Sequence, residues 1–345
     1  MDGLFNLICY NFFMKETIRK VTVISWLLLE IALALYVFDT RRNFTVESPK
    51  MLDISGKDLS VKTGSYLVFD QKTGKILSQQ NMNKKVGIAS TTKLLSMYLV
   101  LDSIDSGKIT WDTPLSVSNY AYALTQDSEV ANVTLNQEEK YKVRELYKAA
   151  LIESANSAPV MLAEGIAGSE PKFVDMMRKK LRDFGIKDAH IINSSGLNNS
   201  LLGGNIYPGS KEDDENYMSA RDMGLVVYHL LKDHPEIVKT TKEVDASFND
   251  DQELITSNMM LEGMSMERSG IDGLKTGTTT YAGQCFIARS IKPYSLVSLV
   301  FKADDGLDDG MARFRATDEL LNRTYASFTP DKIQKNQENL PNLLQ

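Results

Sequence analysis

The sequence predicts an α+β domain whose sheet is antiparallel at least in part. Runs of β-prone residues occur over residues 65–80 and again over residues 273–301, and helical patterns fill the interval between them. Short turns at hairpin spacing separate neighbouring strands, which is typical of antiparallel pairing. Because the early and late strands must meet in one sheet, we expect the intervening helices to pack beside that sheet.

The composition is that of a globular protein and excludes two classes of function. The chain has 345 residues, 43% hydrophobic and 24% charged, which is ample for a sizeable core. A net charge of −6 without a basic cluster argues against nucleic-acid binding. The two cysteines, Cys9 and Cys285, and three scattered histidines lack metal-ligand spacing, so we expect neither a disulfide nor a metal site.

The N-terminal part contains a membrane or export signal. Residues 21–38 form an apolar run of about 18 residues, just long enough to cross a bilayer. Residues 1–20 carry an excess of Lys and Arg near this run, which places the rest of the chain outside the cytoplasm. Ala32-Leu33-Ala34 also has the form of a signal-peptidase site, so a transmembrane anchor and a cleaved signal peptide both stay open.

The remaining chain is predicted to form one domain. A polar stretch over residues 39–59 is interpreted as a linker, the domain covers residues 60–328, and the polar tail over residues 329–345 is expected to be frayed. The predicted strands are Ser65–Asp70, Lys75–Gln80, Gly273–Gly277, Gln284–Ser290 and Tyr294–Phe301.

The interval between the strands is predicted to be helical. Ser90 begins a helix whose body, Leu94–Leu101, is apolar on nearly all sides, as in a helix at the centre of a domain. Residues 141–168 give two helical pieces broken around Ser154-Ala155-Asn156. The other segments are helices that begin at Pro171 and after Ser219, a solvated loop over Gly203–Asn216 with the charge run Lys211–Glu215, and a closing helix over residues 310–328.

The tripeptide Lys-Thr-Gly occurs three times, and two copies have a structural explanation. Lys62-Thr63-Gly64 is interpreted as a bend before the first strand. Lys72-Thr73-Gly74 follows Asp70 in a hairpin turn, where Asp bonds to the nearby backbone and Gly adopts positive φ. The third copy, Lys275-Thr276-Gly277, lies on a late strand and is the candidate for chemistry.

Ser90-Thr91-Thr92-Lys93 has the form Ser-x-x-Lys, which pairs a hydroxyl with an amine. Residues three apart lie on one face of a helix, so Lys93 can reach the Ser90 hydroxyl. Apolar surroundings disfavour an ammonium and lower a lysine pKa, which would let Lys93 accept a proton near neutral pH. Ser90 at a helix N-terminus also meets free backbone N–H groups, an environment suited to a nucleophile and an oxyanion hole.

Order and context distinguish this motif from its chance repeats. Ser-x-x-Lys recurs at Ser169–Lys172 in a polar setting, and Ser-x-Asn occurs at both Ser154–Asn156 and Ser247–Asn249. One set alone has Ser-x-x-Lys on a buried helix, then Ser-x-Asn at an interhelical break, then Lys-Thr-Gly on a late strand. That set contains Ser90, Lys93, Ser154, Asn156 and Lys275.

In this order the motifs resemble those of the penicillin-binding D-alanyl-D-alanine carboxypeptidases, serine peptidase family S11 of the β-lactamase/transpeptidase superfamily. The resemblance covers residues 65–328 and implies a transpeptidase-like fold, an antiparallel sheet flanked by helices with an all-helical subdomain. Its landmarks are IASTTKLLS around Ser90, IESANSAPVMLAE around Ser154, NSSGL at Asn193–Leu197, SARDMG at Ser219–Gly224 and GIDGLKTGTTTYAGQCFIARS around Lys275.

The resemblance implies a hydrolase that removes the terminal D-alanine of peptidoglycan stem peptides, is acylated by β-lactams and needs no metal or organic cofactor. Ser90 would attack the carbonyl of the penultimate D-alanine, Lys93 would take its proton, and Ser154 would relay a proton to the leaving group. Asn156 would bind the peptide backbone, and Lys275 and Thr276 would bind the terminal carboxylate. The backbone N–H groups of Ser90 and Thr278 would form the oxyanion hole. Gly277 would lie in the substrate site, and Arg221 would lie near it.

The resemblance also implies a location and contains departures. The enzyme would act at the extracytoplasmic face of the bacterial membrane, held by its N-terminal helix, or would be secreted after signal cleavage. The β-rich C-terminal domain and C-terminal anchor of many members have no counterpart, which favours the N-terminal anchor. Ser157 replaces the usual Asp and Thr278 replaces a histidine, so local hydrogen bonding and substrate preference are expected to differ. Cys285 is interpreted as a packing residue.

Three alternatives stay open at this point. A β-lactamase or esterase of the same fold is one, although class A β-lactamases need a deacylating glutamate and Glu212 and Glu215 lack the expected pattern. A catalytically silent envelope protein that uses the fold for binding is another, and the complete motif set argues against it. A generic membrane-anchored α+β domain with accidental motifs is the third. Within the family, the motifs do not decide the balance among carboxypeptidase, endopeptidase and transpeptidase activity.

Overall fold

The computed structural model describes residues 62–249, 251–303, 310–335 and 340–344. The chain divides into two compact units, residues 1–50 and 51–345, and every described residue belongs to the second unit. The predicted anchor or signal at residues 21–38 and the predicted linker at residues 39–59 lie outside the described residues. Across the described ranges, no helix is long and apolar enough to span a bilayer.

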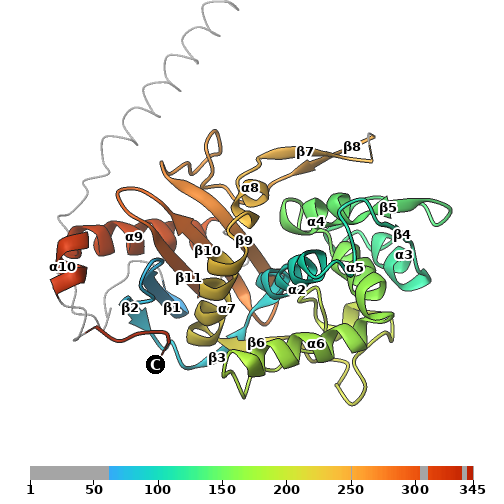
Figure 1. Ribbon diagram of the computed structural model, residues 1–345, viewed down its shortest axis with the longest axis horizontal. Helices are drawn as coiled ribbons and strands as arrows, with labels where there is room; N and C mark the ends of the chain where they lie inside the picture. The colour runs from blue at the N-terminus through green and yellow to red at the C-terminus, as the bar shows by residue number, and fades with distance from the viewer. Residues whose placement is uncertain (1–61, 250, 304–309, 336–339, 345) are drawn as a thin grey trace, which may run out of the picture. The chain divides into compact units, whose positions relative to one another are not determined.

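A five-stranded antiparallel sheet brings the two ends of the domain together (Figure 1). Its order is β2-β1-β11-β10-β9, and β1 pairs with β11 so that Leu67 lies opposite Leu299. The prediction that early and late strands meet in one antiparallel sheet is therefore confirmed. The strands are β1 (Thr63–Asp70), β2 (Ile76–Gln80), β9 (Ile271–Thr279), β10 (Gly283–Ser290) and β11 (Leu296–Ala303).

Helices fill the sequence between β2 and β9, as predicted, and short strand pairs join some of them. The helical segments are η1 (Ala89–Thr92), α2 (Lys93–Asp105), α3 (Asn119–Thr125), α4 (Val143–Leu151), α5 (Ser157–Ala167), α6 (Glu170–Asp183), η2 (Asn199–Leu201), α7 (Ala220–Asp233) and α8 (Ile237–Thr241). The strand pairs are β3 (Lys85–Gly87) with β6 (Tyr217–Ser219), β4 (Pro114–Ser116) with β5 (Lys140–Lys142), and β7 (Asp245–Phe248) with β8 (Gln252–Ile255).

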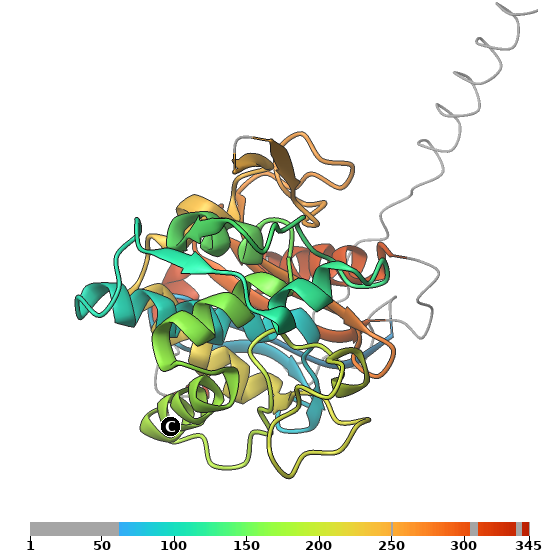
Figure 2. The same ribbon diagram turned by 90° about the vertical axis from the view of Figure 1, so that its right-hand side faces the viewer.

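The sheet separates two hydrophobic cores because successive side chains on a strand point to opposite faces. On β1, Leu67 and Phe69 belong to a large core shared with the helices, whereas Tyr66 and Val68 belong to a smaller core. The smaller core packs under α9 (Ala312–Ser327). Helix α9 thus covers one face of the sheet, and α2 and α7 lie on the other (Figure 1). Figure 2 shows the helical part standing in front of the sheet.

Helix α2 lies at the centre of the large core, as its all-round apolar sequence predicted. Residues 93–101 are all buried, so this helix has no solvent-facing side over its first turns. The helix that precedes the predicted break ends at Leu151, and the next begins at Ser157. The break around Ser154-Ala155-Asn156 is therefore confirmed.

The repeated motifs that were set aside have structural roles. Ser169 is the N-cap of α6, and its Oγ accepts a hydrogen bond from the Lys172 backbone N–H. In the β1–β2 turn, Asp70 Oδ1 accepts from the Thr73 N–H at 2.8 Å, so Lys72-Thr73-Gly74 is a hairpin turn. The first copy differs slightly from the prediction, because Thr63 and Gly64 already belong to β1.

The structure corrects the prediction for the tail and, at one end, the prediction for the loop over Gly203–Asn216, most of which is exposed as expected. The described part of the tail is ordered: α10 (Pro330–Lys335) buries Ile333, and residues 340–344 lie against the β1–β2 turn, where Lys75 bridges Asn342. Buried Leu340 and Leu343 supply the apolar area that a frayed tail would lack. In the loop before β6, Glu215 is fully buried although the charge run around it was expected to be solvated.

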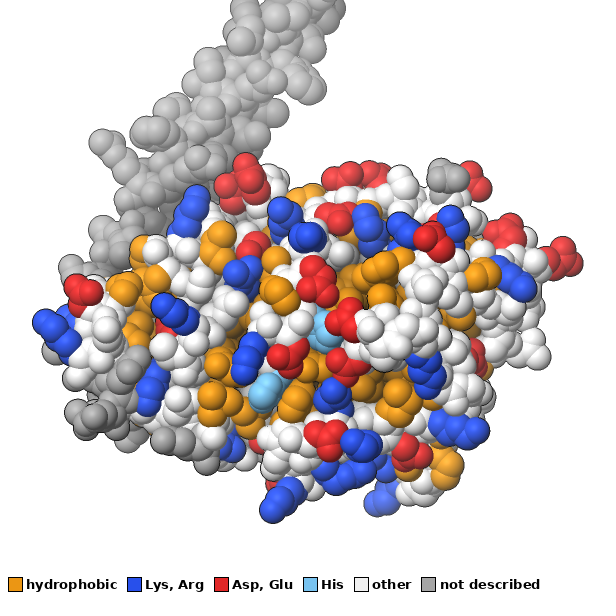
Figure 3. Space-filling model, viewed as in Figure 1, with side chains coloured by type: hydrophobic (Ala, Val, Ile, Leu, Met, Phe, Trp, Pro, Cys, Tyr) orange, Lys and Arg blue, Asp and Glu red, His pale blue; other side chains and the backbone are white. Residues whose placement is uncertain are grey.

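The surface seen in Figure 3 carries charged side chains of both signs among hydrophobic ones, rather than one basic patch. This distribution agrees with the small negative net charge of the whole chain, −6.

Candidate active site

Three segments far apart in sequence converge on Ser90. Ser90 lies in the short helical turn η1, which leads directly into α2, and its side chain is partly exposed. The strand β9 passes so close that a Cβ on Gly277 would lie 2.9 Å from the Ser90 backbone nitrogen. A Cβ on Gly196 of the NSSGL segment would lie 1.9 Å from the Ala89 carbonyl oxygen. Both positions therefore require glycine, because any side chain would push these segments away from Ser90.

Lys93 is fully buried and its ammonium nitrogen meets three oxygen atoms. Nζ lies 2.9 Å from Ser90 Oγ, 2.7 Å from Asn156 Oδ1 and 2.9 Å from the Ser195 carbonyl oxygen. Burial, with a smaller contribution from the charge of Lys275, holds the pKa of Lys93 well below its ordinary value. The expected contact between Ser90 and Lys93 is present, and so is the expected direction of the pKa shift.

This arrangement suits a neutral amine that accepts a proton. A neutral Lys93 donates two N–H bonds, to Asn156 and to the Ser195 carbonyl, and its lone pair then faces the Ser90 hydroxyl. The hydroxyl in turn donates to Nζ, which is the hydrogen bond along which a serine proton would move. The geometry therefore allows Lys93 to act as a base toward Ser90.

The break between α4 and α5 places the Ser-x-Asn motif on the same side of the domain. Ser154 adopts a φ of 65°, in the left-handed region that is strained for a residue with a side chain. Asn156, two residues later, bonds to Lys93 through Oδ1, and its Nδ2 donates to the Ala131 carbonyl oxygen at 2.9 Å. The Asn132 side chain accepts from the N–H groups of Asn156 and Ser157. The motif is thus fixed by a neighbouring loop, and Ser154 stays partly exposed.

The Lys-Thr-Gly strand forms the opposite wall. Lys275 is buried, and its Nζ donates to the Thr276 carbonyl oxygen at 3.1 Å. Burial and, to a smaller extent, the positive charge of Arg313 lower the pKa of Lys275 to about 7, whereas Glu153 opposes the shift. Strand β9 is an edge strand of the sheet, so one side of its backbone has no neighbouring strand in the described sheet.

Arg313 is a site residue that the sequence analysis missed. From the first turn of α9, its guanidinium donates to the Gly277 carbonyl oxygen at 2.9 Å and to Thr278 Oγ1 at 2.6 Å. A cation near a helix N-terminus is unfavourable for the helix dipole, and this position is the local signal that could have marked it. Ser257 was also missed: its Oγ lies 2.5 Å from Thr276 Oγ1.

The sequence predicts Arg221 near this site, but its described hydrogen bonds are with other parts of the domain. It lies at the start of α7, where its backbone N–H donates to the Met82 carbonyl oxygen and its guanidinium contacts the Leu343 carbonyl oxygen at 3.4 Å. The SARDMG segment begins a helix capped by Ser219 rather than lining the cleft. Arg221 therefore connects α7 with the C-terminal segment.

Glu215 and Asn216 form hydrogen bonds to both walls of the site from the interior of the domain. Glu215 Oε2 accepts from Thr279 Oγ1 at 2.7 Å, just beyond the Lys-Thr-Gly motif, and burial raises the pKa of this carboxyl. Asn216 Oδ1 accepts from the Ile192 N–H, and Asn216 Nδ2 donates to Thr92 Oγ1 at 3.1 Å. These bonds explain why the end of a polar loop is buried.

The two noted departures have local explanations. The N–H of Ser157 donates to Asn132, whereas Ser157 Oγ is buried with no hydrogen-bond partner among the described residues. Local hydrogen bonding thus differs from that of a carboxylate, as expected. Cys285 is fully buried in the large core, where burial raises the pKa of its thiol to about 12, so its interpretation as a packing residue is confirmed.

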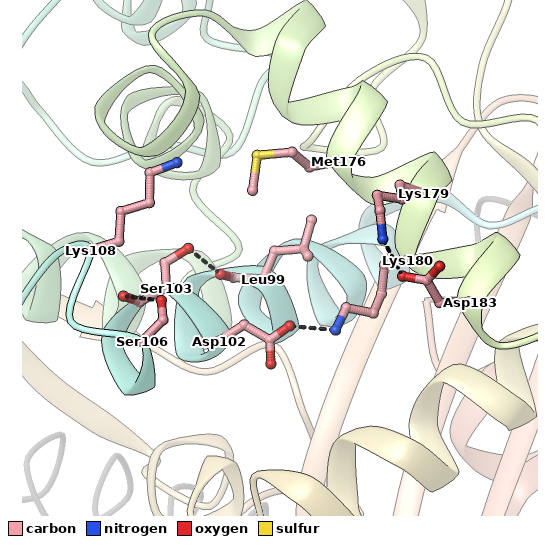
Figure 4. A pocket seen from close by; sticks show the side chains of 9 residues that line it. All are labelled: Leu99, Asp102, Ser103, Ser106, Lys108, Met176, Lys179, Lys180 and Asp183. Atoms are coloured by element: carbon pink, nitrogen blue, oxygen red, sulfur yellow. Dashed lines mark hydrogen bonds and ion pairs between the residues drawn. The ribbon is translucent and has the colours of Figure 1, made fainter.

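A separate cavity of about 350 Å³ lies between α2 and α6 (Figure 4). Its lining includes Leu99, Met176 and the ion pair of Lys180 with Asp102, whose atoms Nζ and Oδ2 are 2.5 Å apart. Asp102 lies in α2, about two and a half helical turns beyond Lys93, so this cavity is not part of the candidate site.

Comparisons with known proteins agree with this geometry. A family model described as D-alanyl-D-alanine carboxypeptidase matches residues 52–305. A D-alanyl-D-alanine carboxypeptidase of Bacillus subtilis is 29% identical over 239 residues, which is 68% of this chain and 56% of that protein. The chain therefore spans little more than half of that relative.

Solved structures are similar to the same part of the chain. One is a peptidoglycan synthesis regulatory factor (PBP3) from Streptococcus pneumoniae, 42% identical, covering 78% of this chain and 72% of that chain with a TM-score of 0.75. Another is penicillin-binding protein D2 from Listeria monocytogenes in its ampicillin-bound form, 25% identical, covering 78% of this chain and 99% of that chain with a TM-score of 0.65.

Proposed function

The chain belongs to the D-alanyl-D-alanine carboxypeptidase family, and we propose that it is a serine hydrolase that removes the terminal D-alanine of peptidoglycan stem peptides and is acylated by β-lactams. The observation that carries the proposal is the buried Lys93 amine, 2.9 Å from Ser90 Oγ and facing the Lys-Thr-Gly strand. The substrate class is supported by the name of the Bacillus subtilis relative, and β-lactam acylation by the ampicillin-bound Listeria protein.

Acylation would begin with the hydroxyl proton of Ser90. The proton passes to Lys93 Nζ as Ser90 Oγ forms a bond to the carbonyl carbon of the penultimate D-alanine. The developing oxyanion would be held by the backbone N–H groups of Ser90 and Thr278, which the close approach of Gly277 to Ser90 brings near each other. Loss of one such donor typically costs about 10²–10³ in rate.

The leaving amine needs a proton as the carbon–nitrogen bond breaks. Ser154 would relay it from the ammonium of Lys93. Asn156, two residues after Ser154 in the same break, accepts a hydrogen bond from Lys93 through Oδ1. D-alanine then departs and leaves an ester on Ser90. Water hydrolyses this ester, so that the peptide acid is released and Ser90 regains its proton.

The terminal carboxylate would be recognised by an excess of buried positive charge. Within the described residues, Lys275 and Arg313 bond to carbonyl and hydroxyl oxygens, not to carboxylates. Burying cations without anionic partners is costly, so this wall is complementary to an anion. The hydroxyls of Thr276 and Thr278 lie on the same stretch of β9 and are available as donors.

The backbone of the substrate would run along β9. An edge strand offers N–H and C=O groups to an extended peptide, which adds to the sheet as another strand. Asn156 on the facing wall would bond to the peptide backbone from the other side. Peptidoglycan lies outside the cytoplasmic membrane, so we place the enzyme in the cell envelope, anchored or exported by residues 21–38.

The decisive test is covalent labelling with a fluorescent penicillin together with D-alanine release from a pentapeptide. The wild type should be labelled and should release D-alanine, whereas Ser90→Ala should do neither. Ser169→Ala, in the second Ser-x-x-Lys sequence, is the matched control and should behave as the wild type. Labelling that is absent in the wild type, or that persists in Ser90→Ala, would refute the proposal.

The β-lactamase alternative has no support in the geometry. Glu215 bonds to Thr279, and Glu212 is exposed, whereas Lys93 bonds to Ser90, Asn156 and Ser195. Neither glutamate is thus placed like a deacylating base. Slow stoichiometric acylation by nitrocefin is expected, and rapid steady-state turnover would instead favour the β-lactamase.

A further inference from the structure

The β7–β8 hairpin is firmly attached to the helical wall of the site. Its Phe248 ring stacks on Tyr141 at a centroid distance of 5.4 Å with an interplanar angle of 9°. The Gln252 side chain forms two hydrogen bonds, of 2.7 and 2.9 Å, with the Thr134 backbone. In Figure 1 the hairpin extends from α8 above α4 and β5. The hairpin is therefore not a free surface loop on this side.

Directly after the hairpin, the chain crosses to the sheet wall. Phe248 and Leu254 belong to the large core, whereas Met260 and Leu261 belong to the smaller core under α9. The change of core takes place over residues 255–258, which we call the crossing segment. Because buried residues fix both of its ends, the crossing segment has a defined path past the site.

The crossing segment contacts both walls of the cleft. The Ile255 N–H donates to Glu153 Oε2 at 2.7 Å, and Glu153 is the residue before Ser154. Two residues later, Ser257 Oγ lies 2.5 Å from Thr276 Oγ1 on the Lys-Thr-Gly strand. The Thr256 and Asn258 backbones are also bonded, to Val244 and to Thr256 Oγ1. The segment therefore spans the cleft from Glu153 to Thr276.

We propose that the crossing segment closes the cleft beyond the terminal carboxylate and that Ser257 is a specificity-determining residue that donates a hydrogen bond to this carboxylate. The inference rests on the proposed function, and it makes the enzyme an exopeptidase. The terminal carboxylate of a bound peptide would have to lie beside Thr276. The crossing segment would therefore exclude peptides that continue past the terminal D-alanine.

The chemistry of the pair supports a role in binding rather than in packing. Ser257 is exposed while Thr276 is buried, so the pair presents one accessible and one shielded hydroxyl. When Thr276 donates to Ser257, the Ser257 hydroxyl keeps its own proton for a carboxylate placed beside the pair. Lys275, the residue before Thr276, adds positive charge, and hydrogen bonds to a charged acceptor are about twice as strong as neutral ones.

The test compares three peptides with the same acyl part. They are diacetyl-Lys-D-Ala-D-Ala as the free acid, its C-terminal amide, and the acid extended by one glycine. For each peptide, kcat and KM are measured for cleavage after the penultimate D-alanine. The wild type should cleave the amide with at least about 100-fold lower kcat/KM, because the amide is uncharged, and should not cleave the extended peptide.

Substitution of Ser257 should change recognition and leave the chemistry intact. Ser257→Ala should raise KM for the acid about 10-fold with kcat within about twofold, because one hydrogen bond to a charged group is lost. Its kcat/KM for the amide should hardly change, so the discrimination between acid and amide falls. Ser257→Thr keeps a hydroxyl and should restore most of the discrimination. Ser265→Ala, exposed in the same loop, is the matched control.

Each outcome supports or overturns the inference. It is overturned if the wild type cleaves the glycine-extended peptide as fast as the acid, or if Ser257→Ala keeps the wild-type ratio of acid to amide. Saturating label by fluorescent penicillin shows that each variant is folded. If no peptide is cleaved and Ser90 is not labelled, the proposed function itself fails, which is a different result.

Discussion

The two walls of the site each contain a buried lysine, and the two lysines have different surroundings. On the helical wall, Lys93 meets three oxygen atoms of Ser90, Asn156 and Ser195. On the sheet wall, Lys275 bonds to one backbone carbonyl and lies near a second cation, Arg313. Burial lowers the pKa of both lysines, yet only Lys93 has protein partners for all of its hydrogen-bonding capacity.

The difference teaches that desolvation alone does not assign a role to a lysine. The hydrogen-bonding capacity of Lys93 is satisfied by the protein without a ligand, and its amine faces the Ser90 hydroxyl. A low pKa therefore makes Lys93 a proton acceptor. Among the described residues, Lys275 forms no hydrogen bond or ion pair with a carboxylate, although the charge of Glu153 acts on its pKa, so it is complementary to a negatively charged ligand. Substitutions on the two walls should therefore change different kinetic parameters of the enzyme.

The largest effect is expected from Lys93→Met, which removes the base. Acylation by a β-lactam should slow by about 10²–10⁴, the usual contribution of general acid–base catalysis. The measurement is the second-order acylation rate with a fluorescent penicillin. Lys72→Met, in the hairpin Lys-Thr-Gly copy, should leave the rate unchanged. A loss of less than tenfold in Lys93→Met would remove the distinction between the walls.

Lys275→Met should impair recognition more than chemistry. Loss of the buried positive charge should raise KM for the free-acid peptide about 10- to 100-fold, with a smaller change in kcat. Steady-state kinetics of D-alanine release give both parameters. A change in kcat as large as that in Lys93→Met would mean that both lysines take part in proton transfer.

The pH dependence of peptide affinity should distinguish the role of Lys275 from that of Lys93. A pKa of about 7 means that raising the pH removes the proton from Lys275, which weakens carboxylate binding. The affinity of the Ser90→Ala variant for the peptide should fall roughly fivefold between pH 7 and pH 8, following the protonated fraction. Calorimetric titration measures this affinity. In the Ser90→Ala, Lys275→Met double variant the pH dependence should vanish, and its persistence would assign it to another group.

The smallest effect is expected from Glu215→Gln, behind the sheet wall. The Gln side chain still accepts the hydrogen bond from the Thr279 hydroxyl. Glu215→Ala removes this acceptor and should lower the free energy of unfolding by about 1–3 kcal/mol. Because burial raises the folded-state pKa, the native protein binds the proton more tightly than the unfolded chain. Wild-type stability should thus fall relative to Glu215→Gln as pH rises above the ordinary glutamate pKa. Urea unfolding at several pH values tests the sign.

The sequence was sufficient for the parts of the site that lie in local motifs. Ser90 and Lys93 share one helical turn, so their contact follows from spacing. The break at Ser154 and the position of Lys-Thr-Gly on a late strand followed from patterns of helix and strand. Such features depend on neighbouring residues, which the sequence shows directly.

The features that were missed depend on tertiary contacts. Arg313 and Ser257 reach the site because α9 and the crossing segment pack beside β9. Ser257 has no local motif, and the only local signal at Arg313 is its position in the first turn of a helix. Arg221 was expected near the site, whereas its motif begins a helix and its guanidinium contacts the C-terminal segment. Glu215 was expected to be solvated because its sequence neighbours are charged. It is instead buried, and its carboxylate accepts a hydrogen bond from the Thr279 hydroxyl.

The two borders of the sheet are not equivalent. At one border the C-terminal segment joins the start of β2, where the Ile76 N–H donates to the Pro341 carbonyl oxygen and the Leu343 N–H to the Gly74 carbonyl oxygen. The opposite border, β9, has no such partner in the described sheet. Copies of the domain stacking border to border would need an open border on both sides. In the described part of the domain the C-terminal segment covers the start of β2, so stacking is disfavoured there and the open border is β9.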